Sequence, residues 1–188
     1  FGSQGFTTSG STGLIKNGSG TLALAGNTYG AGFTLNAGTV VARSVNAFGQ
    51  SAVNNLTING GTIASDGGLT FLTTKFASIL VNSDFTLGST ISPAVSTATL
   101  SFASPVNLGT SNRNITVNGT GTNTFSGTIS GGAGGGIELK SGSTGTLVLS
   151  GANTYSGGIT VSGGTLILSG ANTYSGATTL NGGTLTLG

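Results

Sequence analysis

The sequence predicts an all-β fold, a β-solenoid whose stacked coils are about 19 residues long. The first observation is an internal repeat, because residues 150–168 and 169–187 are identical at 14 of 19 positions. The second is a series of short apolar alternations separated by glycine turns, which is typical of strands. The third is the lack of helix signals, since no helical apolar period runs through the chain and Glu, Lys and Arg are scarce.

Composition favours an ordered chain over a disordered one. The 188 residues include 37 glycines and only 4% charged residues, against about 25% in ordinary soluble domains. Disordered chains lack apolar strand formers, whereas 36% of this chain is hydrophobic and arranged in periodic triplets. We therefore expect the glycines to serve as corners of a folded solenoid.

The N-terminal part divides into an extension and the start of the solenoid. Residues 1–13 carry Phe1 and Phe6 in a Gly/Ser/Thr tract that has no repeat partner. We assign them to an N-terminal extension, a candidate subunit-linking segment, and residues 14–188 to the solenoid. A weaker copy of the repeat follows, with a spacing one position shorter and strand-like segments at 20–24, 33–35 and 38–41.

The middle of the chain keeps its strand signals but loses the exact period. Residues 56–63 form another copy of the repeat. From residue 66 onwards the repeat blurs, although strand-like triplets recur at 69–71, 85–87, 100–102 and 115–117. Residues 131–136, Gly-Gly-Ala-Gly-Gly-Gly, are expected to form a loop or a wide corner. We interpret this region as irregular coils of one continuous solenoid, and not as a boundary between two domains.

The C-terminal repeats give the clearest strands, at 147–149, 166–168 and 185–187, with second strands at 159–161 and 178–180. Because successive side chains alternate between the two faces of a strand, Leu147, Leu166 and Leu185 are predicted to form one internal ladder. Each fully buried leucine contributes about 1.5–3 kcal/mol. The glycine pairs between the strands are predicted to form corners that need a positive φ.

Two polar or aromatic columns accompany the leucine ladder. An aromatic ladder that packs coil on coil is expected from Tyr155 and Tyr174, with Tyr29 and Phe125 at equivalent positions. A carbohydrate-stacking platform is the alternative for this column. An amide ladder or a set of Asx turns is expected from Asn153 and Asn172, with Asn27 equivalent.

A family resemblance rests on three pieces of sequence. Residues 150–157, Ser-Gly-Ala-Asn-Thr-Tyr-Ser-Gly, precede a Gly-Gly-Thr-Leu, residues 44–49 precede a Leu-Thr-Ile-Asn-Gly-Gly-Thr, and residues 123–131 repeat the theme. Over about 13–65 and 114–188, the chain resembles the autotransporter-associated β-strand repeat of secreted bacterial passenger domains. The resemblance implies a single-stranded, right-handed parallel β-helix at an extracellular location, carried by proteins that are mostly adhesins, surface fibres or spacers.

The few acidic residues offer little for catalysis. Asp66 and Asp84 lie eighteen positions apart, near one coil period, which would stack them on one face as a polysaccharide-acting β-helix requires. Solvated turn positions are the simpler account of this pair. Glu138 and Lys140 are expected to share one face of a strand and to form a weak surface pair. We therefore predict no catalytic residue and no enzyme.

Other ligand classes are also disfavoured. Without His or Cys, and without several carboxylates in one loop, no metal site and no cofactor are predicted. The chain has no apolar run long enough for a membrane span. Nucleic-acid binding needs a cluster of cations, but the basic residues are scattered at Lys16, Arg43, Lys75, Arg113 and Lys140.

These observations predict a structural extracellular protein, a subunit of a bacterial surface fibre built by end-to-end stacking of coils. A β-solenoid exposes unpaired strand edges at its ends, so the expected partner is a second copy, added head to tail. The candidate interface residues are Phe1 and Phe6 at one end and Leu185 and Leu187 at the other. The main alternative is an adhesin passenger or stalk that binds cell-surface or glycan ligands. An ice-binding face is a further alternative, but the threonine rows at Thr146, Thr165 and Thr184 are irregular.

Overall fold

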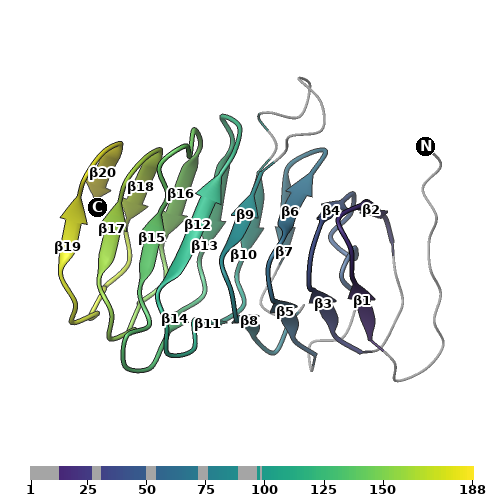
Figure 1. Ribbon diagram of the computed structural model, residues 1–188, viewed down its shortest axis with the longest axis horizontal. Helices are drawn as coiled ribbons and strands as arrows, with labels where there is room; N and C mark the ends of the chain where they lie inside the picture. The colour runs from purple at the N-terminus through teal and green to yellow at the C-terminus, as the bar shows by residue number, and fades with distance from the viewer. Residues whose placement is uncertain (1–12, 27–30, 50–53, 72–75, 89–96, 98) are drawn as a thin grey trace.

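A computed structural model shows three parallel sheets wound into a β-solenoid of about 7 turns, with about 23 residues per turn (Figure 1). The structure describes residues 13–26, 31–49, 54–71, 76–88, 97 and 99–188. No helix occurs among these residues. The predicted all-β solenoid is therefore confirmed, while Phe1, Phe6, Asn27 and Tyr29 lie outside the described residues.

Each sheet collects one strand from successive coils. Sheet A contains β1 (Leu14–Lys16), β3 (Phe33–Leu35), β5 (Leu56–Ile58), β8 (Ile79–Val81), β11 (Val106–Asn107) and β14 (Ile129–Ser130). Sheet B contains β2 (Thr21–Leu24), β4 (Thr39–Ala42), β6 (Thr62–Ser65), β9 (Phe85–Leu87), β12 (Arg113–Val117), β15 (Ile137–Leu139), β17 (Ile159–Val161) and β19 (Thr178–Leu180). Sheet C contains β7 (Leu69–Phe71), β10 (Leu100–Phe102), β13 (Thr122–Phe125), β16 (Thr146–Leu149), β18 (Thr165–Leu168) and β20 (Thr184–Leu187).

The chain visits the sheets in the order A, B, C, and within the described residues only the central coils place strands in all three sheets. The first coils pair strands in sheets A and B, and sheet C begins at β7. The last coils pair strands in sheets B and C, and sheet A ends at β14. Sheet B thus runs the full length of the solenoid (Figure 1).

The predicted coil length holds at the two ends and is wrong for most of the solenoid. The strand register joins Leu14 to Phe33 and Thr165 to Thr184, which is the spacing of the sequence repeat. In the centre the step is longer, since Phe85 pairs with Ile115. The added positions lie in the connections between strands, where they leave the ladder intact, and lengthening a loop costs little free energy.

One of these longer connections contributes a phenylalanine side chain to the core. Residues 43–55 join β4 to β5, and Phe48 from this connection is 4% exposed. Its ring meets the ring of Phe33 edge-on at 5.0 Å between centroids, and that of Phe76 at 6.1 Å. The added residues therefore bury apolar surface in exchange for the entropy of the longer loop.

A single apolar core fills the solenoid from β2 to β18. Side chains alternate as the sequence predicts, so Leu147 and Leu149 are fully buried and Val148 between them is partly exposed. The predicted glycine corners take positive φ, at 61° for Gly164 and 70° for Gly183. A Cβ on Gly183 would also collide with the carbonyl oxygen of Gly164 in the coil below.

Candidate functional site

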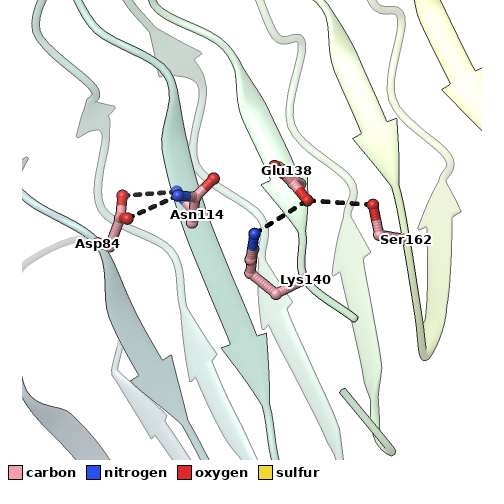
Figure 2. Close-up of polar contacts among 5 residues, drawn as sticks. All are labelled: Asp84, Asn114, Glu138, Lys140 and Ser162. Carbon is pink, nitrogen blue, oxygen red and sulfur yellow. Dashed lines mark hydrogen bonds and ion pairs between the residues drawn. The ribbon is translucent and has the colours of Figure 1, made fainter. Parts of the chain in front are cut away.

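Charged side chains gather on the outer face of sheet B. The whole chain has only eight acidic and basic residues, and three of them lie there: Asp84 in one coil, and Glu138 and Lys140 together two coils further on (Figure 2). Asp84 immediately precedes β9, Glu138 lies within β15, and Lys140 follows it. They face outward because the alternate residues Phe85, Ile137 and Leu139 are buried in the core.

The polar side chains of this face are linked from coil to coil. The Oδ1 atom of Asp84 accepts a hydrogen bond from the backbone N–H of Asn114 at 2.8 Å, and its Oδ2 accepts one from Nδ2 of Asn114 at 2.6 Å. Glu138 Oε1 lies 3.3 Å from Nζ of Lys140 and accepts a hydrogen bond from Oγ of Ser162 at 3.1 Å. The predicted pairing of Glu138 with Lys140 is confirmed (Figure 2).

A shallow hollow of about 340 Å³ opens beside this network. The register of β6 with β9 places Gly60 opposite Asp84, so no side chain fills the row at this point. The walls carry a carboxylate, an amide, hydroxyl groups and an ammonium group, from Thr62, Asp84, Thr86, Asn114, Thr116 and Lys140. This set of donors and acceptors suits a ligand rich in hydroxyl groups.

The carboxylates on this face are not arranged as a catalytic pair. Asp84 and Glu138 lie in one row of sheet B with Asn114 between them, which separates their backbones by two coil spacings, about 10 Å. The carboxylate of Asp84 is hydrogen-bonded to Asn114, and the carboxylate of Glu138 is paired with Lys140. Among the described residues, no group of three His, Cys, Asp or Glu side chains could hold a metal ion.

The stacking of Asp66 on Asp84 that their spacing allows does not occur. Asp66 follows β6 and forms an ion pair with Arg43, with 2.7 Å between Oδ2 and Nε. Because Thr62 pairs with Thr86, Asp84 lies opposite residue 60, six positions before Asp66. Six strand positions correspond to about 20 Å. The spacing of the two aspartates is close to the short C-terminal coil, from Thr165 to Thr184, whereas the local coil, from Thr62 to Thr86, is longer.

The structure places the predicted leucine ladder in sheet C. Leu147 pairs in register with Leu166, and Leu166 with Leu185. Leu147 and Leu166 are fully buried, and Leu185 packs against the core from the last coil. Leu187, on the same strand, is 72% exposed.

The two tyrosines of the repeat form a stack. The rings of Tyr155 and Tyr174 are 5.2 Å apart and inclined by only 3°. Tyr155 is fully buried, its hydroxyl has no hydrogen-bond partner among the described residues, and burial together with Tyr174 raises the pKa of its phenol. Phe125 does not occupy the equivalent position, because it lies on β13, pairs with Leu149 and stacks on Phe102 at 5.3 Å.

The asparagines beside these tyrosines bridge three coils. Oδ1 of Asn153 accepts a hydrogen bond from the backbone N–H of Ile129 at 3.0 Å, and its Nδ2 donates to Oδ1 of Asn172 at 2.6 Å. Asn172 in turn donates to the carbonyl of Gly170 at 2.9 Å. Asn153 is fully buried, so these bonds satisfy its amide inside the core.

Sequence reasoning missed a second amide ladder, on the corner between sheets A and B. Asn36 donates to Asn17 at 2.6 Å, Asn59 to Asn36 at 2.7 Å and Asn82 to Asn59 at 2.9 Å. All four side chains directly follow a strand of sheet A, which is the signal that could have revealed them. This ladder ties the first four coils together on the outside.

A buried lysine was also missed. Lys16 is only 8% exposed, and its Nζ donates to the backbone carbonyls of Asn17, Gly18 and Ala37 at 2.7–3.1 Å. The ammonium group thereby joins the first corner to the corner of the next coil. In the sequence Lys16 was one of five scattered cations, with nothing to mark it as a structural group.

Comparisons with known proteins identify the repeat. The model of the passenger-associated-transport-repeat matches residues 14–42, 140–167 and 163–187. No curated protein and no solved structure matches the chain. Within the described residues, no helix is long and apolar enough to cross a membrane. The segments at both ends of the described solenoid are thus similar to the passenger-associated-transport-repeat.

Proposed function

We propose that this passenger-like structural domain is a rigid, non-catalytic rod at a bacterial surface, and that it builds a fibre by end-to-end stacking. The observation that carries the proposal is the single apolar core that runs through the coils without interruption. Sheet B contains eight strands, so its seven spacings give a rod of about 34 Å. The passenger-associated-transport-repeat is typical of secreted or surface proteins, and this supports a location at the bacterial surface.

The last coil has the groups that stacking needs. The backbone N–H groups of Thr184 and Gly188 donate back to the coil below. In a parallel strand, alternate residues bond to opposite neighbours, so Leu185 and Leu187 direct their backbone groups away from the coil below. The side chains of Leu180 and Leu187 are 54% and 72% exposed on this coil. A further coil would pair these strand edges and bury both leucines.

Electron microscopy of the purified chain tests stacking directly. We expect the wild type to form filaments one solenoid wide, and Leu187→Lys to abolish them by placing a charge in the stacked core. Thr186→Lys is the matched control, because it adds the same charge on the outer face of the same strand. A wild type that remains monomeric at high concentration contradicts the fibre proposal.

The hollow on sheet B favours a second candidate function, adhesion to a glycan. Its hydroxyl, amide and charged groups fit a saccharide, while no exposed aromatic ring is among the described residues that line it. Asp84→Asn removes the charge with little change of shape, and Asp66→Asn is a control away from the hollow. On a glycan array, we expect binding by the wild type and the control and at least tenfold weaker binding by Asp84→Asn. Equal binding by all three proteins, or by none, contradicts this function.

A further inference from the structure

One outward row of sheet B carries a threonine in five successive coils. The strand register of β2, β4, β6, β9 and β12 joins them into a threonine row, which consists of Thr21, Thr39, Thr62, Thr86 and Thr116. All five side chains are at least partly exposed, and none of their hydroxyl groups has a hydrogen-bond partner among the described residues. Because neighbouring strands lie about 4.7–4.9 Å apart, the row is about 19 Å long.

The threonine row crosses the hollow and extends beyond it. Thr62, Thr86 and Thr116 line the hollow, whereas Thr39 and Thr21 lie outside it in the preceding coils. In the other direction the register of β12 with β15 places Lys140, which also lines the hollow, next in the same row. The hollow is therefore one part of a longer line of hydrogen-bonding groups that follows the rod axis.

The chemistry of this face favours a long ligand over a single sugar. The outward positions of the sheet B strands carry no aromatic ring among the described residues, so a sugar cannot stack there. Binding must rely on hydrogen bonds, and one neutral hydrogen bond is worth only about two- to tenfold in affinity. A chain of sugars that follows the threonine row gains further hydrogen bonds at each coil, whereas a single sugar in the hollow does not.

The charges beside the row favour a neutral ligand. Asp84, Glu138 and Lys140 supply two carboxylates and one ammonium group, a net charge of −1, and Lys140 is paired with Glu138. An acidic polysaccharide would meet two carboxylates on this face, and like charges brought together across an interface are costly. A neutral polysaccharide meets only donors and acceptors that its hydroxyl groups can match.

We infer that the ligand of sheet B is a neutral, unbranched polysaccharide of the β-1,4-linked glucan class, which lies along the rod axis over the threonine row. The inference rests on the glycan binding proposed above for the hollow. A β-1,4-linked glucan is a straight ribbon with hydroxyl groups along both edges, so it can follow a straight row, whereas an α-1,4-linked glucan coils away from it. Asp84 and Lys140 would bind the sugars at the hollow, and Thr39 and Thr21 would bind their continuation.

Titration calorimetry of the full chain with three soluble probes tests this inference. Cellohexaose is the long straight probe, cellobiose the short one, and maltohexaose has the composition of cellohexaose but coils. We expect cellohexaose to bind at least tenfold more tightly than either of the others. Thr39→Val removes one hydroxyl group outside the hollow and should weaken cellohexaose binding by about two- to tenfold while leaving cellobiose binding unchanged. Thr57→Val is the matched control, because it makes the same change on the outer face of sheet A.

The possible failures separate this inference from the proposed glycan binding. Equal affinity for cellobiose and cellohexaose, or unchanged binding by Thr39→Val, would confine the ligand to the hollow and overturn the extended chain. Equal affinity for maltohexaose would overturn the straight ribbon. If no cello-oligosaccharide binds but another glycan binds in an Asp84-dependent manner, the glucan class is overturned and adhesion stands. If no glycan binds at all, adhesion and this inference both fail.

Discussion

Asn123 interrupts the leucine ladder of sheet C, and replacing it by leucine should stabilise the solenoid. The residue lies on β13, is fully buried and pairs in register with Leu147. The register on its other side places it opposite Leu100. Neither its Oδ1 nor its Nδ2 has a hydrogen-bond partner among the described residues. The core therefore holds a desolvated amide between two leucines.

The size of the effect follows from two gains and one cost. Removing an unsatisfied buried polar group gains about 1–3 kcal/mol. A buried leucine adds about 1.5–3 kcal/mol relative to an exposed one, while fitting its shape into a packed site costs about 1–3 kcal/mol. We expect Asn123→Leu to raise the free energy of unfolding by about 1–3 kcal/mol. For a chain of this size each kcal/mol corresponds to about 2–4 °C in Tm.

The matched control is the same substitution at a paired asparagine. Asn153 is equally buried, but its amide bonds to Ile129 and Asn172. Asn153→Leu leaves both partners unsatisfied and should destabilise by about 2–4 kcal/mol. Urea titrations followed by circular dichroism compare the two variants with the wild type. If Asn123→Leu lowers the unfolding midpoint as Asn153→Leu does, the account of the buried amide is refuted.

Three further substitutions probe polar side chains, two that link coils by hydrogen bonds and one whose hydroxyl has no hydrogen-bond partner among the described residues. Lys16→Met strips three backbone carbonyls of their shared donor, so we expect a loss of about 1–3 kcal/mol in urea titration; no loss would contradict its role in the first corner. Asn59→Ala removes two rungs of the outer amide ladder and should cost about 1–2 kcal/mol, roughly twice the effect of Asn17→Ala, which removes one; equal effects would argue against a ladder. Tyr155→Phe keeps the ring stack and removes the orphan hydroxyl. Burial raises the pKa of Tyr155 above that of an unfolded tyrosine. The protonated phenol therefore leaves the free energy of unfolding unchanged below about pH 10, and that free energy falls as the pH rises beyond this value, because the unfolded chain loses the proton more easily. Melting curves should therefore show a smaller loss of stability above about pH 10 in the variant, and parallel losses would contradict this explanation.

The strands and the inward leucines could be predicted because their signal is local. Alternation at residues 147–149 fixes which side chains enter the core, and the structure buries Leu147 and Leu149 accordingly. The coil length could not be predicted, because it depends on how many residues each corner adds without disturbing the register. The same uncertainty produced the false pairing of Asp66 with Asp84, since a pairing between coils requires the correct local step.

The outer network of sheet B was partly visible in the sequence. The Glu138–Lys140 pair lies within one strand region and needs only the two-residue period. The link from Asp84 to Asn114 joins residues 30 positions apart, in a coil whose length the repeat does not set. The threonine row was hidden for the same reason, because each of its pairings requires the local step from one coil to the next.

Fibre diffraction from oriented filaments of the full chain tests the central claim, that this passenger-like solenoid is a rod that continues from copy to copy. The coils stack along the rod axis, so the spacing between strands must appear along the filament. We predict a meridional reflection at about 4.7–4.9 Å. Chains that form no filaments, or filaments with this reflection on the equator, would contradict the claim.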